Sequence, residues 1–447
     1  MKELELNAPG WKFIFSDEQG SAIIAQIKAE QEKNQQTRLL RLVKTTTGRR
    51  RIYLFAPEGS SEKFLIKAYL PARFSKRLKY LVRNSRCAQE FFSAKKLAKL
   101  GIPAVKAVAF GFRRDSLLPA EELVIEPYLE DFKTFAQLWR ELAEDVRADQ
   151  CVSPAGEKAK PLFRQLMRLV YQMHQNGVRQ RDFKPDSILA KKSESGFDLI
   201  LSDLERIKFY RGPLSGKKRI VNLGKILQSF FRMESCPEME WLLEGYSKAS
   251  GWDISQGGLR KKVVLSGIQQ LKKHAEQRQS WARDTNELIE KFDQDDLEIR
   301  VSREIGKGAV DKFLETNKIP RAGQVEIAGK KLEMIEADSA KAVMQKYFYL
   351  RELKIKCRPV LLAVDFKNQT PGVFGLEISE SEKTYAQMLN ELSRQERLSL
   401  LAAYAEFISR LEFFGLDLQD EQMNKILVAK SASTYEFLLA SPEQINF

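Results

Sequence analysis

Residues 178–189 read Val-Arg-Gln-Arg-Asp-Phe-Lys-Pro-Asp-Ser-Ile-Leu, and this stretch decides the fold that we expect. Asp182 precedes a short apolar run, and a polar turn follows over residues 192–196. A second apolar run, residues 199–201, ends at Asp203. The pattern predicts a β-hairpin with one carboxylate before it and another after it.

Two carboxylates at the ends of one hairpin suit the transfer of a phosphoryl group. This chemistry depends on positioning and charge neutralisation more than on covalent catalysis. Asp182 would orient and deprotonate a hydroxyl, and Asp203 would hold Mg²⁺, as in a kinase catalytic loop and metal-binding turn. The alternative is that both are ordinary turn residues, since Asp is common beside hairpins.

A lone lysine, Lys67, lies inside the apolar run Phe64–Tyr69, which predicts a strand. A buried lysine needs a partner. The helix expected over Cys87–Leu100 offers Glu90 on its apolar face. A strand lysine paired to a glutamate of the next helix is the arrangement that aims the ammonium at nucleotide phosphates.

Two further stretches suggest a nucleotide site. Gly48 lies in a Thr/Gly turn between two expected strands, where backbone N–H groups can face phosphates, although a plain hairpin is the alternative. Glu126 and Tyr128 lie in the expected connector to a second lobe, where adenine could bind main-chain groups. His174, at the end of a predicted helix, is expected to be a capping or core residue.

The length of 447 residues predicts two or three domains. A hydrophobic content of 43% and a charged content of 30% are typical of a soluble globular protein. We expect neither a signal segment nor a membrane span, because no apolar run approaches 18 residues. Four cysteines without CxxC spacing argue against zinc and disulfides and indicate a reducing cytosol: Cys87, Cys151, Cys236 and Cys357.

The net charge of +14 belongs to the first part of the chain, because residues 291–447 carry −3 and residues 1–290 therefore carry +17. Basic side chains cluster at Arg49–Arg51 and over residues 73–86. Such a field favours an anionic partner, either a membrane surface, a phosphorylated glycolipid or nucleic acid. Nucleic acid is not expected, because no helix-turn-helix, zinc-finger or RNA-binding motif is present.

The catalytic stretch has a second copy. Residues 177–209 align without a gap with residues 415–447, and 11 of the 33 positions are identical. A match of this kind predicts two related domains in tandem. We place them at residues 1–290 and 291–447.

The second copy lacks most of the chemistry of the first, and it ends at residue 447 before any counterpart of the helices that follow Asp203. We therefore expect a truncated pseudokinase domain that regulates, binds a protein partner as a scaffold, or only stabilises the chain. The expected replacements are Ser441 for Asp203, Glu336 for Lys67 and Lys346 for Glu90, and Asp420 alone repeats Asp182.

Over roughly residues 11–285 the chain resembles the lipopolysaccharide core kinases, the Kdo and heptose kinase family of Gram-negative bacteria. The resemblance implies an α+β fold, bilobal and protein-kinase-like, with an N-lobe over about 10–126 and a C-lobe over about 130–290. It rests on Phe64–Tyr69, Glu90 with Leu97 and Gly101-Ile102-Pro103, Met173-His174-x-x-Gly177, Arg181-Asp182-Phe183 and Ser202–Arg206.

The resemblance also implies a function. Members of this family use ATP and Mg²⁺ to phosphorylate a heptose or Kdo hydroxyl of the lipid-anchored inner core, on the cytoplasmic face of the inner membrane. The partners implied are that glycolipid and the anionic membrane surface. By resemblance, Asp182 is the base beside Arg181 and Lys184. Lys67 binds the ATP phosphates and Glu90 fixes Lys67, while Asp203 and Ser187 hold Mg²⁺.

Two positions depart from the family pattern. Gln180 stands where the family favours His, and Ser187 replaces the usual His with a weaker metal ligand. Lys184 resembles the lysine that contacts the transferred phosphate in Ser/Thr kinases. Two alternatives therefore stay open: a protein or small-molecule kinase of the same fold, and a regulatory scaffold for a true core kinase.

Overall fold

The computed structural model forms two compact units, Met1–Gly267 and Ile268–Phe447, which we describe separately. The division falls inside helix α8 (Gly257–Gln279), whereas the sequence places it after residue 290. The structure describes residues 10–33, 40–46, 50–57, 61–69, 85–115, 118–147, 155–194, 196–231, 237–254, 257–280, 285–286, 288–353, 355–367, 369–378, 383–414, 416–418, 426–431 and 434–446.

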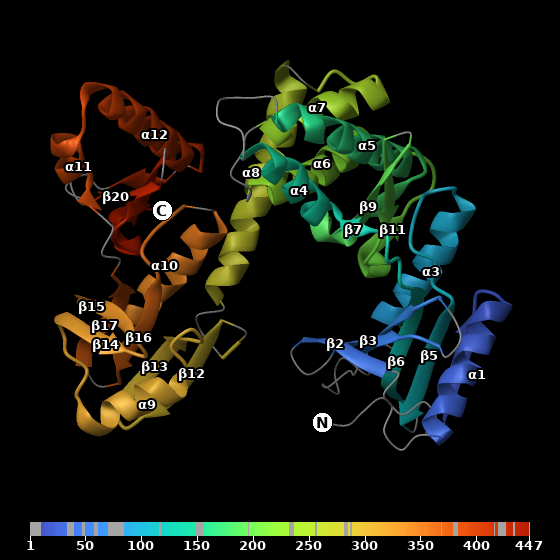
Figure 1. The fold of residues 1–447 in the computed structure, drawn as a ribbon, viewed down its shortest axis with the longest axis horizontal. Coiled ribbons are helices and arrows are strands. Elements are labelled where there is room, and N and C mark those ends of the chain that lie inside the picture. The colour runs from blue at the N-terminus through green and yellow to red at the C-terminus, as the bar shows by residue number, and fades with distance from the viewer. Residues whose placement is uncertain are drawn as a thin grey trace. The chain divides into compact units, whose positions relative to one another are not determined.

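The first unit begins with a six-stranded antiparallel sheet (blue to cyan in Figure 1) in the order β1-β5-β6-β4-β3-β2. Apolar and β-branched residues at alternating positions build these strands, because successive side chains point to opposite faces. The strands are β1 Trp11–Phe15, β2 Leu40–Thr46, β3 Arg50–Phe55, β4 Phe64–Tyr69, β5 Ala109–Asp115 and β6 Leu118–Pro127.

One helix packs on each face of this sheet. Helix α1 (Glu18–Lys33) buries its isoleucines against the sheet, and the cluster includes Phe55 and Ile66. Helix α3 (Arg86–Lys99) covers the other face, and its Phe91 and Leu97 are fully buried. The hydroxyl of Ser85 accepts from the amide of Ala88 and so caps the start of α3.

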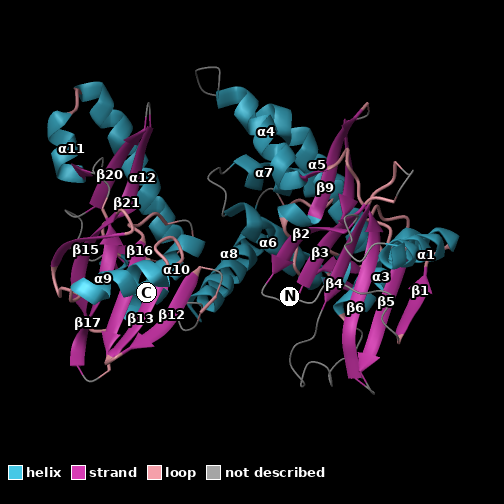
Figure 2. Cartoon of the chain, turned by 60° about the horizontal axis from the view of Figure 1, so that its bottom comes forward, coloured by secondary structure: helices cyan, strands magenta, loops and turns pink. Residues whose placement is uncertain are grey.

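The second half of this unit is mostly helical (Figure 2), and its core is aromatic. Phe163 of α5 contacts the rings of Phe135, Trp139, Phe230 and Trp241 at centroid distances of 5.2–5.8 Å. The elements are β7 Lys133–Thr134, α4 Phe135–Arg147, α5 Ala155–Gln175, β8 Val178–Gln180, β9 Ile188–Ser193, β10 Gly196–Leu201, β11 Ile207–Phe209, α6 Gly216–Phe231, α7 Pro237–Ser250 and α8.

The hairpin predicted from the sequence is formed by β9 and β10, whose register pairs Ile188 with Leu201. Strand β8 pairs with β11 beside it, so the chain before the hairpin returns next to the chain after it. Asp182 and Asp203 therefore lie at the same end of the hairpin, at the loops that leave its first and last residues.

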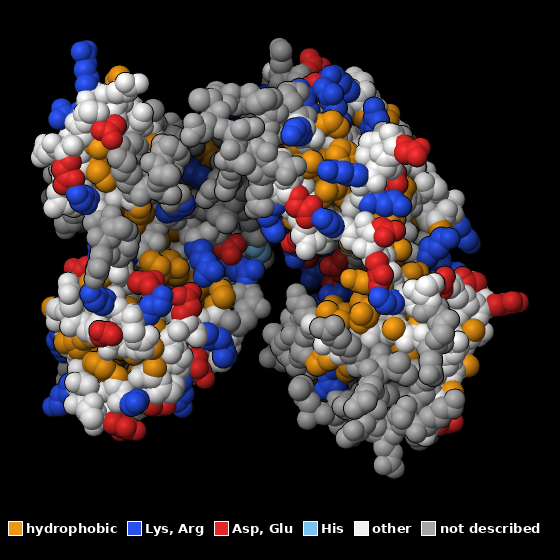
Figure 3. Space-filling model, in the orientation of Figure 1, with side chains coloured by type: hydrophobic (Ala, Val, Ile, Leu, Met, Phe, Trp, Pro, Cys, Tyr) orange, Lys and Arg blue, Asp and Glu red, His pale blue; other side chains and the backbone are white. Residues whose placement is uncertain are grey.

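Basic residues of this unit are spread over its surface. On the face drawn in Figure 3, coloured Lys and Arg side chains alternate with acidic and apolar ones. Much of the basic cluster over residues 73–86 lies outside the described residues, although Arg86 is described. On this face the positive charge is therefore not gathered in one patch. The attraction of an anion to the site depends on the cations beside that site.

The second unit also contains an α+β arrangement (yellow to red in Figure 1), with a six-stranded sheet ordered β12-β13-β16-β17-β15-β14. Its elements are β12 Ile289–Gln294, β13 Leu297–Ser302, α9 Lys307–Thr316, β14 Gly323–Ile327, β15 Lys330–Ala337, α10 Ala340–Glu352, β16 Val360–Phe366, β17 Gln369–Glu377, β18 Lys383–Thr384, α11 Tyr385–Glu391, α12 Arg394–Phe413, β19 Asp417–Leu418, β20 Ile426–Ser431, β21 Thr434–Leu439 and β22 Ile445–Asn446.

The sequence repeat is also a repeat of strand register. In the first unit Ile188 pairs with Leu201, and in the second Ile426 pairs with Leu439, each 238 positions later. The same offset relates the β8–β11 pairing to the β19–β22 pairing. The gapless alignment of residues 177–209 therefore carries over to the backbone wherever the second copy is described.

Gly177 is required by the turn that delivers the chain from α5 to the catalytic loop. Its φ is +68°, and a Cβ there would lie 2.3 Å from the carbonyl oxygen of Gly212. Gly101 ends α3 with a similar φ of +66°, but a Cβ there would meet nothing within 4 Å. A side chain at Gly101 would therefore meet only the cost of a left-handed backbone. A side chain at Gly177 would also clash with the backbone of Gly212.

We predict that Gly101→Ala lowers the free energy of unfolding by about 1 kcal/mol, the usual cost of a left-handed residue. Gly177→Ala should lower it by roughly 3 kcal/mol or more, because the backbone must also move. Denaturant unfolding of both variants measures the difference. Equal losses in the two variants would show that the close approach to Gly212 does not matter.

Candidate active site

A buried ion cluster lies between the sheet and α3. The Lys67 ammonium is 2.7 Å from Oε1 of Glu90 and 2.6 Å from Oε2 of Glu126. The ion pair that the sequence predicts between Lys67 and Glu90 is therefore present. The second carboxylate, Glu126, comes from β6, and in the sequence interpretation this residue belonged to the adenine-binding connector.

Burial and mutual attraction set the charges of this cluster. Burial opposes the charge of Lys67, but Glu126 and Glu90 outweigh it and raise the pKa of the ammonium. Burial also opposes ionisation of Glu90, yet Lys67 lowers the pKa of that carboxyl. For Glu126 burial prevails and raises its pKa to about 8. Near neutral pH the cluster thus holds one ammonium, one carboxylate and one neutral acid.

The catalytic loop places cations around Asp182. Oδ2 of Asp182 is 3.3 Å from the Lys184 ammonium and 3.9 Å from Nε of Arg206. The carboxylate is partly accessible, with 29% of its side chain exposed. Arg181 is exposed, and its backbone amide donates to the carbonyl of Arg206. An accessible carboxylate beside two cations can contact an acceptor hydroxyl.

The turn after the hairpin fixes the direction of Asp203. This residue has a left-handed backbone (φ 55°, ψ 58°), a conformation that Asp tolerates better than most residues. Nη2 of Arg50 lies 3.7 Å from Oδ1 of Asp203. That oxygen is buried and receives no hydrogen bond from the described residues.

Gln180 supports the Asp203 turn. Its Nε2 donates to the carbonyl oxygen of Asp203 at 3.1 Å, and its own carbonyl accepts from Nδ2 of Asn222 at 2.9 Å. His174 continues the chain, with Nε2 3.0 Å from Oδ1 of Asn222 and Nδ1 2.8 Å from the Tyr246 hydroxyl. His174 is fully buried, and burial lowers its pKa to about 4. Its burial and contacts agree with the core role expected from the sequence.

The sequence interpretation treated Gln180 only as a departure from the family pattern. The structure gives it a positioning role, because a side-chain amide can donate to a carbonyl as an imidazole N–H can. No local signal in the sequence identifies this contact, because Asp203 and Asn222 follow Gln180 by 23 and 42 residues.

Ser187 is the second predicted metal ligand, and its hydroxyl is already used. It donates to the carbonyl of Lys184 at 2.8 Å and accepts from the amide of the same residue at 3.1 Å. These bonds close the turn before β9. One lone pair of the oxygen remains, so any contribution of Ser187 to a cation is secondary to that of Asp203.

The residues around Asp203 suit Mg²⁺ in the way that kinases use it. Among the described residues, no group of three or more His, Cys, Asp and Glu could hold a metal alone. Mg²⁺ commonly needs only one or two protein carboxylates, because phosphate oxygens and water complete its octahedron. The buried Oδ1 of Asp203, which lacks a hydrogen bond, meets that requirement.

The two other predicted cofactor-binding positions, Gly48 and Tyr128, have different outcomes. Gly48 lies outside the described residues. Tyr128 is exposed, and its backbone amide donates to the carbonyl of Lys63 at 2.8 Å, so that N–H is engaged within the protein. The buried side chain of Glu126, rather than its main chain, is what faces Lys67.

In the second unit the corresponding strand positions differ from those expected. The amide of Tyr128 bonds the carbonyl of Lys63, and the amide of Ile378 bonds that of Lys331 in the same way. Four residues after Lys63 comes Lys67, and four residues after Lys331 comes Ile335. The expected match of Lys67 to Glu336 is therefore wrong by one residue, and Glu336 is instead half exposed, with its carboxylate 3.3 Å from Arg321.

The helix alignment is wrong as well. The matched backbone bonds Ile102→Leu97 and Ile355→Leu350 close α3 and α10, and they place Lys346 three residues beyond the counterpart of Glu90. The counterpart of Glu90 is Val343 when the two helices are aligned at their C-terminal ends. It is Met344 when they are aligned at their N-caps, Ser85 and Ser339. By the same register Leu376 matches Glu126, so apolar residues replace all three members of the ion cluster: Ile335, Val343 or Met344, and Leu376.

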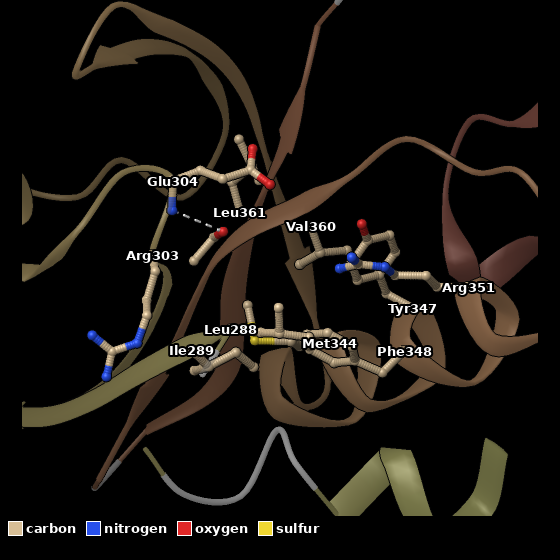
Figure 4. Close-up of a pocket in the computed structure, with 11 residues that line it drawn as sticks. Leu288, Ile289, Arg303, Glu304, Met344, Tyr347, Phe348, Arg351, Val360 and Leu361 are labelled. Atoms are coloured by element: carbon tan, nitrogen blue, oxygen red, sulfur yellow. Dashed lines mark hydrogen bonds between the residues drawn. The ribbon is translucent and has the colours of Figure 1, made fainter. Parts of the chain in front are cut away.

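A cavity of about 280 Å³ lies in the second unit (Figure 4). Apolar side chains from β12, α10 and β16 form much of its wall, among them Ile289, Met344 and Val360. Glu304 is the single acidic residue that lines it. The cavity therefore has no pair of carboxylates comparable to Asp182 and Asp203.

Comparison with known proteins assigns the first unit to a family. Its protein-kinase-like fold, with a lysine–glutamate pair and two loop carboxylates, defines the class. Residues 35–246 match the model of the lipopolysaccharide kinase (Kdo/WaaP) family, so this part of the chain carries a domain of that family. Family membership implies the use of ATP. The second unit is an α+β region that this family model does not cover.

No curated protein matches the chain. Among solved structures, one described as "WaaP in complex with acyl carrier protein" is 17% identical in sequence, with a TM-score of 0.39. The alignment covers 56% of this chain and 91% of that chain. No helix among the described residues has the length and apolar character needed to cross a membrane.

We predict that Glu126→Gln makes stability less dependent on pH. Folded Glu126 keeps its proton up to about pH 8, whereas unfolded Glu loses it near 4.5, so the native state holds more protons between these values. The free energy of unfolding of the parent therefore falls as pH rises through that window. Thermal unfolding at pH 6 and pH 9 should show a larger loss in the parent than in Glu126→Gln.

The matched control is Glu141→Gln, which changes an exposed carboxylate that pairs with Lys133. It should follow the pH dependence of the parent. A Glu126→Gln variant that loses as much stability as the parent at pH 9 would contradict the assignment of the proton to Glu126.

The register of the second unit makes a separate prediction. Ile335→Lys introduces an ammonium beside the apolar cluster and should lower the free energy of unfolding by roughly 1–3 kcal/mol. Glu336→Lys changes an exposed position and should have an effect within about 0.5 kcal/mol. Denaturant unfolding distinguishes the two, and the reverse order of losses would restore the original alignment.

Proposed function

We propose that the first unit is an ATP-dependent phosphotransferase that phosphorylates a sugar hydroxyl, heptose or Kdo, of the lipopolysaccharide inner core. We further propose that it works as a peripheral protein on the cytoplasmic face of the inner membrane. The observation that carries the proposal is the 2.7 Å pair between Lys67 and Glu90, in the same unit as the Asp182 loop and the Asp203 turn. All four residues lie within the stretch that matches the family model.

Each group has a role in this proposal. Lys67, held by Glu90, neutralises the α- and β-phosphates of ATP. Asp203, with Ser187 in a lesser role, holds Mg²⁺, which supplies positive charge to the nucleotide phosphates when bound. Asp182 accepts the proton of the acceptor hydroxyl. The hydroxyl oxygen then bonds to the γ-phosphorus, while the bond between the γ-phosphorus and the oxygen of ADP breaks. Lys184 offsets the charge on the transferred group.

Cations near the catalytic loop favour an anionic acceptor. Lys184 and Arg206, both more than half exposed in their side chains, flank Asp182. On the adjoining strand and helix, Lys208 and Lys218 lie 5.3 and 4.1 Å from the ring centre of Tyr210. A glycolipid rich in phosphate and carboxylate would be attracted to such a surface.

The second unit, in this proposal, is a degenerate kinase-like domain that binds a partner or regulates the first unit. The shared order of five strands in its sheet, β13-β16-β17-β15-β14 against β1-β5-β6-β4-β3, and the shared hairpin register support common descent. Ile335 in place of Lys67 removes the ammonium that would bind phosphate, and Leu376 replaces Glu126. Ser441 in place of Asp203 removes the metal carboxylate.

One feature favours the second candidate, a protein or small-molecule kinase of the same fold. Lys184 lies two residues after Asp182 and contacts its carboxylate. In this position it resembles the lysine that contacts the transferred phosphate in Ser/Thr kinases. Acceptor preference separates the two candidates, since phosphorylation of peptides without phosphorylation of glycolipid would decide for a protein kinase.

We predict that Mg²⁺–ATP raises the melting temperature of the parent protein, because a ligand bound only to the native state stabilises it. Asp182→Asn should keep this stabilisation and lower transfer to inner-core glycolipid by roughly 10²- to 10⁴-fold, the usual contribution of a general base. Asp186→Asn, an exposed neighbour in the same loop, is the control and should transfer at the parental rate.

Two results would contradict the proposal. Absence of any nucleotide-dependent stabilisation in the parent would point to a scaffold role for both units. Transfer that survives Asp182→Asn would remove the assigned base.

A further inference from the structure

Arg50 occupies a position that no part of the sequence interpretation assigned. It is the first residue of β3. In the β3–β4 pairing Arg50 lies opposite Tyr69, and Ile52 lies opposite Lys67. Residues two apart on a strand share a face, and so do residues opposite each other. Arg50 therefore projects from the same face of the sheet as Lys67.

Arginines from β3 and α3 face the acidic residues of the loop after β10. Nη2 of Arg50 lies 3.7 Å from Oδ1 of Asp203, and Nη1 of Arg86 lies 3.5 Å from Oε1 of Glu205. Arg50, Lys67, Arg86 and Glu205 also line one small cavity of about 10 Å³. The phosphate end of a nucleotide held by Lys67 would meet these arginines.

The pair between Arg50 and Asp203 is long for a hydrogen bond. At 3.7 Å it is a charge contact, and Oδ1 of Asp203 receives no hydrogen bond within the described part of the chain. Burial would lower the pKa of Arg50, but Asp203, Glu90 and Glu205 outweigh it and raise that pKa. Asp203 thus attracts Arg50 by charge, without a hydrogen bond between the two side chains.

The two partners differ in freedom. Asp203 is fixed by its left-handed backbone and by the hydrogen bond from Gln180 to its carbonyl. Arg50 ends in a guanidinium on a long side chain with 28% of its surface exposed. If either group moves when a ligand enters, it is the arginine.

We propose that Arg50 is a phosphate-binding residue of the nucleotide site, and that Asp203 holds it in place when no nucleotide is bound. The inference rests on the proposed function of this site. A cation coordinated by Oδ1 of Asp203 must approach to about 2.1 Å, and a guanidinium cannot share that space. Arg50 then turns to the phosphates, whose oxygens match the paired N–H groups of its fork.

The proposal makes Arg50 and Mg²⁺ competitors for Asp203. Removal of Arg50 should weaken nucleotide binding, and it should also make Asp203 easier for the metal to reach. If the ion pair were merely structural, removal of Arg50 would leave nucleotide binding without Mg²⁺ unchanged, so this binding is the decisive readout.

The test compares Arg50→Gln with the parent in the full-length chain. The readout is equilibrium binding of a fluorescent ATP analogue, first in EDTA and then over a titration of Mg²⁺. We expect Arg50→Gln to weaken binding in EDTA by about tenfold, the loss of one charge-assisted contact. We also expect half-maximal binding at a lower Mg²⁺ concentration than in the parent.

Arg51→Gln is the matched control, because it removes the same charge from the adjacent residue, which alternation places on the opposite face of β3. It should bind as the parent does. Arg50→Lys should fall between parent and Arg50→Gln, since it keeps the charge and loses the fork.

The outcomes are distinguishable. Binding by Arg50→Gln within twofold of the parent, or equal weakening by Arg51→Gln, would overturn the role of Arg50 and leave the proposed function intact. No binding by the parent under either condition would overturn the proposed function and this inference with it.

Discussion

A single buried ammonium, that of Lys67, connects the parts of the first unit on which its chemistry depends. A lysine side chain cannot be buried without compensating charge, so Lys67 draws Glu90 from α3 and Glu126 from β6 toward β4. Burial keeps a proton on Glu126, which leaves the cluster electrically balanced. The helix, two strands and the cavity beside Arg50 are thereby held in one arrangement.

The second unit shows that this frame does not need the ions. Five strands keep the same order there, since β13-β16-β17-β15-β14 corresponds to β1-β5-β6-β4-β3, with Ile335 and Leu376 at two of the three positions and an apolar α10 residue at the third. Buried ion pairs can often be replaced by hydrophobic residues without loss of stability. The charges of the first unit are therefore better explained by binding a ligand than by holding the fold.

A second network, of hydrogen bonds, fixes the loop that carries Asp203. It runs from Tyr246 through His174 and Asn222 to Gln180, and it ends at the Asp203 carbonyl. Every link is buried and neutral at neutral pH, which suits a positioning role. Gln180 thus supports the turn rather than weakening it, and the carboxylate of Asp203 is left free for its own partners.

The sequence by itself determined the strands, the helix with Glu90, the hairpin and the tandem repeat, because each depends on local apolar periodicity or on pairs close in the chain. The hairpin register was transferred correctly to the second unit for the same reason. The strand register was not, since loops of different length separate the repeats, and a shift of one residue exchanges the faces of a strand. That shift made Glu336 look like the partner of Lys67.

Only the tertiary structure brought Arg50 to Asp203, Glu126 to Lys67, and Gln180 to the Asp203 carbonyl. These contacts join residues far apart in sequence. The charge or hydrogen-bonding capacity of one side chain does not indicate which distant group will be its partner.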